Sequence, residues 1–379
     1  MDIIFWSCAF ILAYTFVGYP LILKVLTFRK SRTKLPELKD AELPALSIIL
    51  CIYNGANQLK ARIDNLKKSD YPQDKIHIIV ISDGSTDNPA AIINALNHPN
   101  LTFIEYEKNK GKSNALAIAL SQATTDLIAF ADIRQTFCTH ALKNMVKHFL
   151  IDGANIGAVS GNLKIETDSD NNESDPGLYW KYEKWIREKE SELHSMLGVT
   201  GAIYMAKRSL IPDIPLDILL DDMFIPMAIV DKGYKIKFEP LAIAIDTSSS
   251  STAEEFHRKV RTLAGNFQLI SKLPWLMSPL RNPLFFQFFS HKVLRLIMPY
   301  SLLAMLATSL LLNGFIYQQI FALQAIFYSY TILAYCMIKY GLKLPLASVC
   351  ISFCSLNLAA LIAGWKYLYL SADQIWKKH

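Results

Sequence analysis

The chain has 379 residues, of which 52% are hydrophobic and 19% charged, and its formal net charge is +6. So many apolar and so few charged residues argue against a wholly soluble protein. The modest charge forms no basic stripe, so we expect no nucleic-acid partner. The six cysteines lack CxxC or Cys/His spacing, which argues against a disulfide scaffold or a zinc site.

Uncharged stretches near both ends of the chain predict about four transmembrane helices, one N-terminal and three C-terminal. They are Ile3–Leu23, Leu296–Ile338, which is long enough for two spans meeting near Asn313, and Leu344–Gly364. Buried core helices are the alternative, but about 20 uncharged residues is the length that crosses a bilayer. The first stretch lacks the basic start and cleavage site of a signal peptide, so we expect a retained anchor.

Basic residues next to these stretches indicate the orientation. They follow the first span and separate the last two: Lys24, Arg29, Lys30, Arg32, Lys34, Lys339 and Lys343. The positive-inside rule therefore places the middle of the chain in the cytoplasm of a multi-pass inner or plasma membrane protein. It also places the C-terminus outside, with which Lys377 and Lys378 disagree. Basic residues at membrane ends favour contact with anionic membrane lipids.

From Leu46 to Asn266, short apolar runs alternate with amphipathic ones. The runs at 46–54, 76–83, 101–107 and 127–132 are typical of strands buried on both faces, and helical spacing lies between them at 56–69, 88–97 and 111–123. This alternation predicts an α/β fold with a doubly wound, mostly parallel sheet. Two polar stretches, Glu166–Gly177 and Asp246–Glu255, are predicted loops.

Polar residues end three of these strands: Tyr53 with Asn54, Asp83, and Asp132. In such a sheet, ligands bind at the carboxyl ends of the strands, so these residues are expected to meet in one crevice. Asp83 can accept hydrogen bonds from a ribose or a base, or simply begin an Asp-Gly turn. Lys112 begins a helix, where free amides and its own charge suit a phosphate, although loop lysines are usually solvated.

Two further patterns carry charge. Asp221 and Asp222 stand at a predicted helix start, where they either cap the helix or provide a general base. Arg258 and Arg261 are three residues apart on one helical face. They suit the clamping of a diphosphate, and a solvated basic helix is the alternative.

In this order, the segments resemble the family 2 glycosyltransferases with a GT-A fold, including the membrane-embedded cellulose, hyaluronan and poly-N-acetylglucosamine synthases. The resemblance covers about Phe16 to Gln268, including the Gly-Tyr-Pro at 18–20. It implies inverting transfer of a sugar from a nucleoside diphosphate sugar, usually of uridine, to an acceptor hydroxyl. The product would be a cell-surface polysaccharide or a glycolipid, and the acceptor a glycan or a lipid-linked molecule.

The resemblance also implies roles for individual residues. Asp222 matches the acid that deprotonates the acceptor, and the segment Gly198–Arg208 matches the lining of the donor-sugar and acceptor pocket. Nucleotide binding falls to Tyr53, Asn54, Asp83, Lys112 and Asp132, and the diphosphate to Arg134, Arg258 and Arg261. The sugar pocket would contain Thr200, Gly201 and Asp221. From their ring faces alone, Trp185 is expected either in this pocket, stacked on an acceptor sugar, or at the membrane interface, and Trp180 is expected to pack.

Two departures from the family pattern matter. Asp132 matches the first acid of the DxD motif, but Arg134 replaces the second, which normally binds Mg²⁺ or Mn²⁺. Either Asp132 alone holds the divalent cation, or Arg134 takes over part of its charge, or the two side chains form a local ion pair. In the QxxRW signature of processive members, Arg258 and Thr262 replace Gln and Trp, which weakens any inference of a long polymer product.

The expected organisation is an anchor at 1–25, a cytoplasmic GT-A domain at 40–272, an interfacial amphipathic segment at 273–295 and three transmembrane helices at 296–370. Four spans are few for a polymer channel, so an oligomer or an export partner is a further expectation. Two alternatives remain open: a transferase acting on a polyprenyl phosphate, and a non-catalytic nucleotide-binding membrane scaffold.

Overall fold

A computed structural model describes residues 1–30, 35–151, 153, 155–166, 178–247, 252–338, 340–342 and 344–376. The chain divides into two compact units. Met1–Arg29, Glu173–Lys189 and Ser250–His379 form the helical unit, and Lys30–Asn172 with Glu190–Ser249 forms the sheet unit. The first predicted polar loop lies outside the described residues from 167 to 177. Of the second, Asp246–Glu255, residues 248–251 lie outside them, and for the rest the loop prediction is wrong, because 246–247 end a strand and 252–255 begin a helix.

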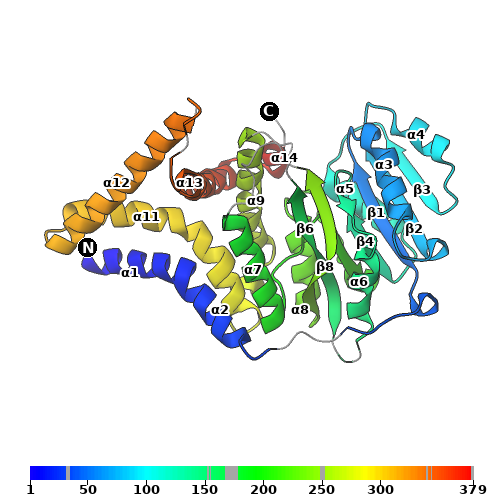
Figure 1. The fold of residues 1–379 in the computed structure, drawn as a ribbon, viewed down its shortest axis with the longest axis horizontal. Coiled ribbons are helices and arrows are strands. Elements are labelled where there is room, and N and C mark those ends of the chain that lie inside the picture. Colours follow the sequence, from blue (N-terminus) through cyan, green and yellow to red (C-terminus); the bar gives the residue numbers. More distant parts are fainter. Residues whose placement is uncertain are drawn as a thin grey trace. The chain divides into compact units, whose positions relative to one another are not determined.

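The sheet unit is built on one eight-stranded sheet with the order β3-β2-β1-β4-β7-β6-β8-β5 (Figure 1). Strands β1 to β4 are mutually parallel, whereas β7 is antiparallel to both of its neighbours, β4 and β6. The predicted α/β sheet is confirmed, and the apolar runs fall on β1 to β4. The strands are β1 (Leu46–Ile52), β2 (Ile76–Asp83), β3 (Leu101–Tyr106), β4 (Leu127–Ala131), β5 (Thr136–Phe137), β6 (Ile156–Glu166), β7 (Ile203–Lys207) and β8 (Lys235–Thr247).

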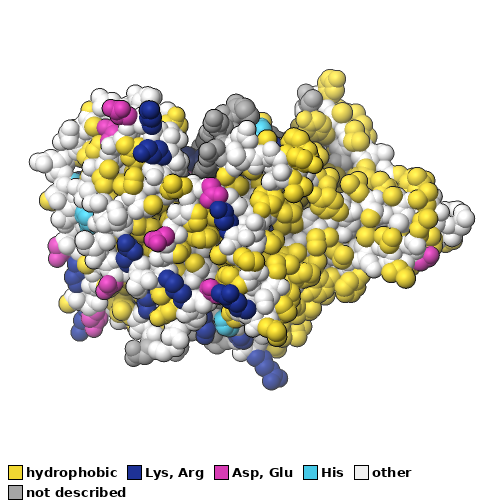
Figure 2. Space-filling view, turned by 180° about the vertical axis from the view of Figure 1, so that it is seen from behind, with side chains coloured by type: hydrophobic (Ala, Val, Ile, Leu, Met, Phe, Trp, Pro, Cys, Tyr) yellow, Lys and Arg dark blue, Asp and Glu magenta, His cyan; other side chains and the backbone are white. Residues whose placement is uncertain are grey.

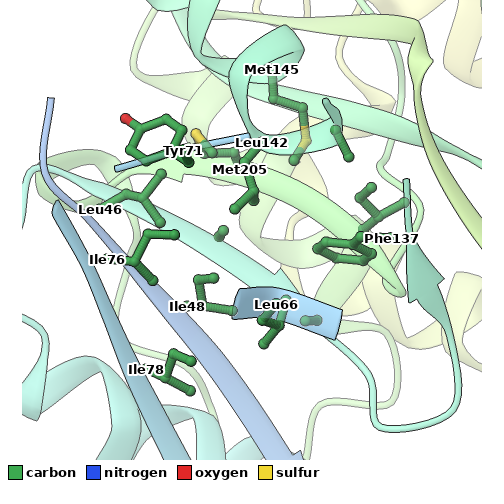
Figure 3. Close-up of a cluster of buried hydrophobic side chains, with 14 of the residues drawn as sticks. Leu46, Ile48, Leu66, Tyr71, Ile76, Ile78, Phe137, Leu142, Met145 and Met205 are labelled. Carbon is green, nitrogen blue, oxygen red and sulfur yellow. The ribbon is translucent and has the colours of Figure 1, made fainter. Parts of the chain in front are cut away.

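Helices cover both faces of this sheet, which explains why its central strands are apolar throughout. Leu46 and Ile48 of β1 join a core with Leu66, Leu142 and Met145, from helices of one face (Figure 3). Burial of these side chains removes apolar surface from water and stabilises the fold. The helices of this unit are α3 (Ala56–Lys67), α4 (Pro89–Leu96), α5 (Lys112–Gln122), α6 (Ala141–Phe149) and α8 (Asp221–Asp231).

The helical unit contains four helices that are long and apolar enough to cross a membrane. They are Asp2–Thr27, Phe285–Leu311, Phe315–Ile338 and Ala347–Tyr369, one N-terminal and three C-terminal as predicted. Figure 2 shows hydrophobic side chains over much of this unit's visible face. Its elements are α1 (Asp2–Ala13), α2 (Tyr19–Thr27), α9 (Thr252–Lys272), α10 (Phe285–Phe288), α11 (Leu294–Leu311), α12 (Phe315–Ile338), α13 (Ala347–Tyr369) and α14 (Ala372–Trp376), while α7 (Leu178–Leu193) runs from this unit into the sheet unit.

The expected interfacial segment, 273–295, contains two different structures. A 3₁₀ turn, Pro274–Met277, follows α9. From Phe285 onward the segment is helical and continuous with the second candidate span, through a π-helical turn at Phe289–Val293. A second π-helical turn, Tyr14–Gly18, interrupts the first candidate span. The Tyr14 hydroxyl and Ser290 Oγ lie 2.8 Å apart and join these two turns.

Candidate active site

Three charged side chains meet where β4 ends. Lys112, the first residue of α5, places its Nζ 3.4 Å from Asp132 Oδ1 and 3.6 Å from Asp221 Oδ2. Burial alone would lower the pKa of Lys112, but the charges of Asp132, Asp221 and Asp222 raise it above its ordinary value. Lys112 is therefore a cation shared between two carboxylates, from the end of β4 and the start of α8.

The loop that carries Lys112 is held by Asp83, at the end of β2. The buried Asp83 carboxylate accepts hydrogen bonds from the backbone N–H of Lys110 (2.7 Å) and Gly111 (2.9 Å). The Asn109 amide donates to the Asp83 carbonyl oxygen at 3.0 Å. Such bonds to a carboxylate are among the stronger ones in proteins. Asp83 thus positions the start of α5, and its contact with a ribose or a base stays a prediction.

The end of β1 is tied to the turn that follows β2. Asn54 has a φ of 50°. Its Oδ1 accepts the Thr86 N–H at 2.8 Å, and its own N–H donates to Ser85 Oγ at 3.1 Å. The neighbouring Tyr53 is 56% exposed, so its ring is open to a ligand. Stacking of a base on this ring is compatible with the geometry and stays a prediction.

The segment before β7 packs on the start of α8. The Val199 N–H donates to the Asp222 carbonyl oxygen at 2.9 Å. A Cβ on Gly201 would lie 3.5 Å from Asp222 Oδ2, so a glycine leaves the carboxylate open on this side. Thr200 is fixed by its N–H, which donates to Ser160 Oγ at 2.9 Å. The structure therefore brings Thr200, Gly201, Asp221 and Asp222 together.

These elements enclose a small polar cavity of about 10 Å³. Its lining includes Lys112, Asp132, Asp221, Gly201, Cys51 and Phe130. Burial raises the pKa of the Cys51 thiol to about 12, so this side chain is neutral at physiological pH. The start of α5 is tied to the segment before α8, because Ser113 Oγ donates to the Ile218 carbonyl oxygen at 3.1 Å.

Arg134 points to a different partner from Asp132. Its Nη2 lies 3.5 Å from Asp246 Oδ2, the same oxygen that accepts a 2.8 Å hydrogen bond from Gln135 Nε2. Among the described residues, the contacts of Asp132 and Arg134 are thus with Lys112 and Asp246, and the local Asp132–Arg134 ion pair does not form. The Arg134 side chain is 44% exposed, which leaves it accessible to an anionic ligand.

The fit of a divalent cation rests on Asp132. Within the described ranges, no group of three or more His, Cys, Asp or Glu side chains could hold a metal ion. Mg²⁺, however, is commonly held by one or two carboxylates together with substrate phosphates. The partly exposed Asp132 carboxylate suits this arrangement, with a cation that enters together with a diphosphate.

Three predicted site residues belong to the helical unit: Trp185 of α7, and Arg258 and Arg261 of α9. Their contribution to the site of the sheet unit stays a prediction. Sequence reasoning did not single out Cys51, Phe130 or Tyr204. For Tyr204 the sequence offered one signal. Strand alternation places this tyrosine on the same face of β7 as Ala206, so a large polar side chain stands next to a small one there.

The helical unit has a cavity of its own, about 360 Å³ in volume. Its lining is largely apolar, with Phe16, Leu263, Met298, Phe353 and Leu356 among its residues.

One charged residue, Arg295, lines the cavity of the helical unit, and it forms an ion pair with Glu183. His291 Nε2 lies 3.1 Å from the other oxygen of the Glu183 carboxylate. Arg295 belongs to a candidate span, and charged residues in such segments usually mark a functional site.

Comparison with known proteins identifies the class. Residues 47–214 match the sequence profile of glycosyl transferase family 2. A mannosyltransferase from Pyrobaculum calidifontis, solved in complex with GDP-Man and Mn²⁺, has the same fold, with a TM-score of 0.73 at 21% identity over 97% of this chain and 99% of that chain. The sheet unit therefore has a GT-A fold and contains a segment that matches family 2 of the glycosyltransferases, in agreement with the resemblance seen in the sequence.

The curated relatives that match include polysaccharide synthases. The poly-beta-1,6-N-acetyl-D-glucosamine synthase of Staphylococcus aureus is 26% identical over 251 residues, which is 64% of this chain and 59% of the relative. The enzyme of the same name from Staphylococcus epidermidis is 25% identical over 255 residues, or 65% of this chain and 60% of the relative. The chain thus matches less than two thirds of the length of these relatives.

Proposed function

We propose that the chain is an inverting membrane glycosyltransferase that moves a sugar from a UDP-sugar to an acceptor hydroxyl, in the synthesis of a cell-surface polysaccharide or glycolipid. The cluster of Lys112, Asp132 and Asp221 at the carboxyl ends of the parallel strands, with Asp222 beside it, is the observation that carries this proposal. This is where α/β sheets bind nucleotides. It also provides cationic and acidic groups for a charged leaving group and a proton transfer.

The chemistry divides between the two ends of the cluster. Lys112 contacts the diphosphate, while Tyr53 and Asp83 contribute to the nucleotide side of the site. A divalent cation, when bound with the donor, supplies positive charge to the leaving diphosphate, and Asp132 would hold it. Asp222 takes the proton of the acceptor hydroxyl as the new bond forms. The N-terminal end of α8 favours ionised carboxylates, which keeps Asp222 able to act as a base.

The test is Asp222→Asn. Transfer should fall at least about 100-fold, because a positioned general base contributes that much or more. The affinity for UDP, measured by calorimetry, should change little, since proton abstraction matters only in the transition state. Asp213→Asn, an exposed aspartate in the segment before α8, is the matched control and should transfer normally. Turnover like that of the wild type in Asp222→Asn would remove this residue from the mechanism.

A screen of the purified protein with radiolabelled nucleotide sugars would identify the donor. It also separates the enzyme from a non-catalytic scaffold, because a scaffold releases no labelled product with any donor.

The location of the catalytic domain in the cytoplasm is part of the proposal. A cysteine at the exposed Asp74 should react with an impermeant thiol reagent only after cell lysis. Labelling of this position in intact cells would reverse the orientation.

The cavity of the helical unit favours a lipid-linked acceptor as a second candidate. An apolar cavity lined by a single charged residue, Arg295, which is paired with Glu183, suits a hydrocarbon chain that ends in a polar head. Ser352→Phe, which fills the cavity, should slow transfer to a lipid extract more than transfer to a soluble oligosaccharide. Leu358→Phe, at an exposed position of α13, is the control. Equal effects on both acceptors would argue against a lipid site in this cavity.

A further inference from the structure

The hydroxyl of Tyr204 is an unexplained polar group at the candidate site. Tyr204 lies in β7 with none of its surface exposed, and its hydroxyl has no hydrogen-bond partner among the residues that the structure describes. Buried polar groups are nearly always paired, and an unpaired one destabilises the folded state. The hydroxyl is therefore either a defect of the fold or a group whose partner comes into reach in another state.

The position of the ring connects Tyr204 to the charged cluster. Tyr204 pairs with Phe130 across β7 and β4, and the two rings stack with their centres 4.2 Å apart and an angle of 4° between them. Phe130 lines the same small cavity as Lys112, Asp132 and Asp221. Burial raises the pKa of Tyr204 well above its ordinary value, and the charge of Asp221 raises it further. The phenol thus stays protonated and can only be used as a neutral hydroxyl.

The charge balance of the cluster must change when a nucleotide enters. Without a donor, the single ammonium of Lys112 lies between Asp132 and Asp221. A diphosphate at this edge attracts the same ammonium, because its charge exceeds that of one carboxylate. Asp221, whose side chain is only 14% exposed, then loses its cation. A carboxylate so little exposed requires another partner in place of that cation.

We propose that Tyr204 is a positioning residue whose hydroxyl donates a hydrogen bond to Asp221 when a nucleoside diphosphate draws Lys112 away from it. This exchange rests on the proposed function, because it requires a diphosphate at the cluster. It gives the buried hydroxyl a partner in the loaded state and keeps the Asp221 side chain fixed next to Asp222. The hydroxyl is then unpaired in the donor-free state because its partner, Asp221, becomes available only when the diphosphate binds.

The first experiment measures stability and nucleotide binding of the full chain in detergent. Tyr204→Phe should raise the Tm of the donor-free protein by about 2 °C, because it removes an unpaired buried hydroxyl. It should also weaken the affinity for UDP about tenfold, measured by calorimetry, because the loaded state loses a hydrogen bond to a charged group. A Tm below that of the wild type would show that the hydroxyl is already paired, and would overturn the proposal.

Tyr71→Phe is the matched control. Tyr71 is also a buried tyrosine of the sheet unit, but its hydroxyl donates to the Pro44 carbonyl oxygen. Its removal should lower the Tm and leave the affinity for UDP unchanged. Opposite signs of the Tm change in the two variants would distinguish an unpaired hydroxyl from a structural one. The same sign in both would count against the proposed exchange.

A double-mutant cycle identifies the partner of the hydroxyl. In an Asp221→Asn background, Tyr204→Phe should no longer weaken UDP binding tenfold, because the charged acceptor is gone. An undiminished tenfold loss would mean that Tyr204 acts on the nucleotide directly, and would overturn the role of Asp221. A wild-type protein that binds neither UDP nor GDP would overturn the proposed function and this inference together. Equal UDP affinity in wild type and Tyr204→Phe would overturn this inference alone.

Discussion

The two hydrogen bonds of the Asp83 carboxylate give a prediction with a defined magnitude. Asp83→Asn keeps the size of the side chain but turns one acceptor oxygen into an NH₂ group, which then faces a backbone N–H. The bonds from Lys110 and Gly111, 2.7 and 2.9 Å long, are both made to a charged acceptor. Losing one such bond and weakening the other should reduce the free energy of unfolding by about 3 kcal/mol.

A loss of this size should lower the Tm of the purified protein by roughly 6–12 °C, as read by differential scanning fluorimetry. UDP binding should weaken as well, because the loop presents Lys112. Asp74→Asn, a surface aspartate of the same unit, is the control and should leave the Tm unchanged. If Asp83 served only the ribose or base, Asp83→Asn would weaken UDP binding at an unchanged Tm. That result would refute the structural role that the two buried hydrogen bonds assign to Asp83.

Three further predictions concern neighbouring positions. Gly84→Ala should lower the Tm, because Gly84 has a φ of +66° and an added Cβ would lie 2.3 Å from the Asn109 nitrogen; an unchanged Tm would contradict the tight turn. Cys51, whose pKa is raised to about 12 by burial, should react with iodoacetamide at pH 8 far more slowly in the folded protein than in urea, and rapid labelling of the folded protein would show that the thiol is accessible. Arg134→Asp restores a second acid next to Asp132, so UDP binding should depend more strongly on Mn²⁺ than in the wild type; equal Mn²⁺ dependence in a calorimetric titration would exclude Arg134 from the cation site.

Much of the fold could be predicted because the central strands are buried on both faces. Strands β1 to β4 coincide with continuous apolar runs, and Asp83 and Asp132 stand at their ends as expected. The apolar spans at both ends of the chain were equally clear, since length and the absence of charge decide them. The reversed direction of β7 could not be predicted, because strand alternation carries no information about the direction of the neighbouring strand.

The partners of the charged residues could not be predicted either. The amides that bind Asp83 lie 27 and 28 residues further along the chain, and the carboxylate that Arg134 contacts lies 112 residues away. A local motif specifies which groups are present but not which tertiary contacts they make. For this reason the sequence left a nucleotide role and a turn role open for Asp83, and for Arg134 a share in the charge of the cation or a local ion pair with Asp132.

The reversed direction of β7 has a consequence for how such a domain can diversify. Because β7 is antiparallel to β4, its first residue, Ile203, pairs with the last residue of β4, Ala131. The site therefore consists of the segments that follow β1, β2 and β4 and of the segment that precedes β7. Under the proposed function, the first group serves the nucleotide and the second the sugar and acceptor. Substitutions before β7 can therefore change which molecule is glycosylated, while the residues that bind the nucleotide stay the same.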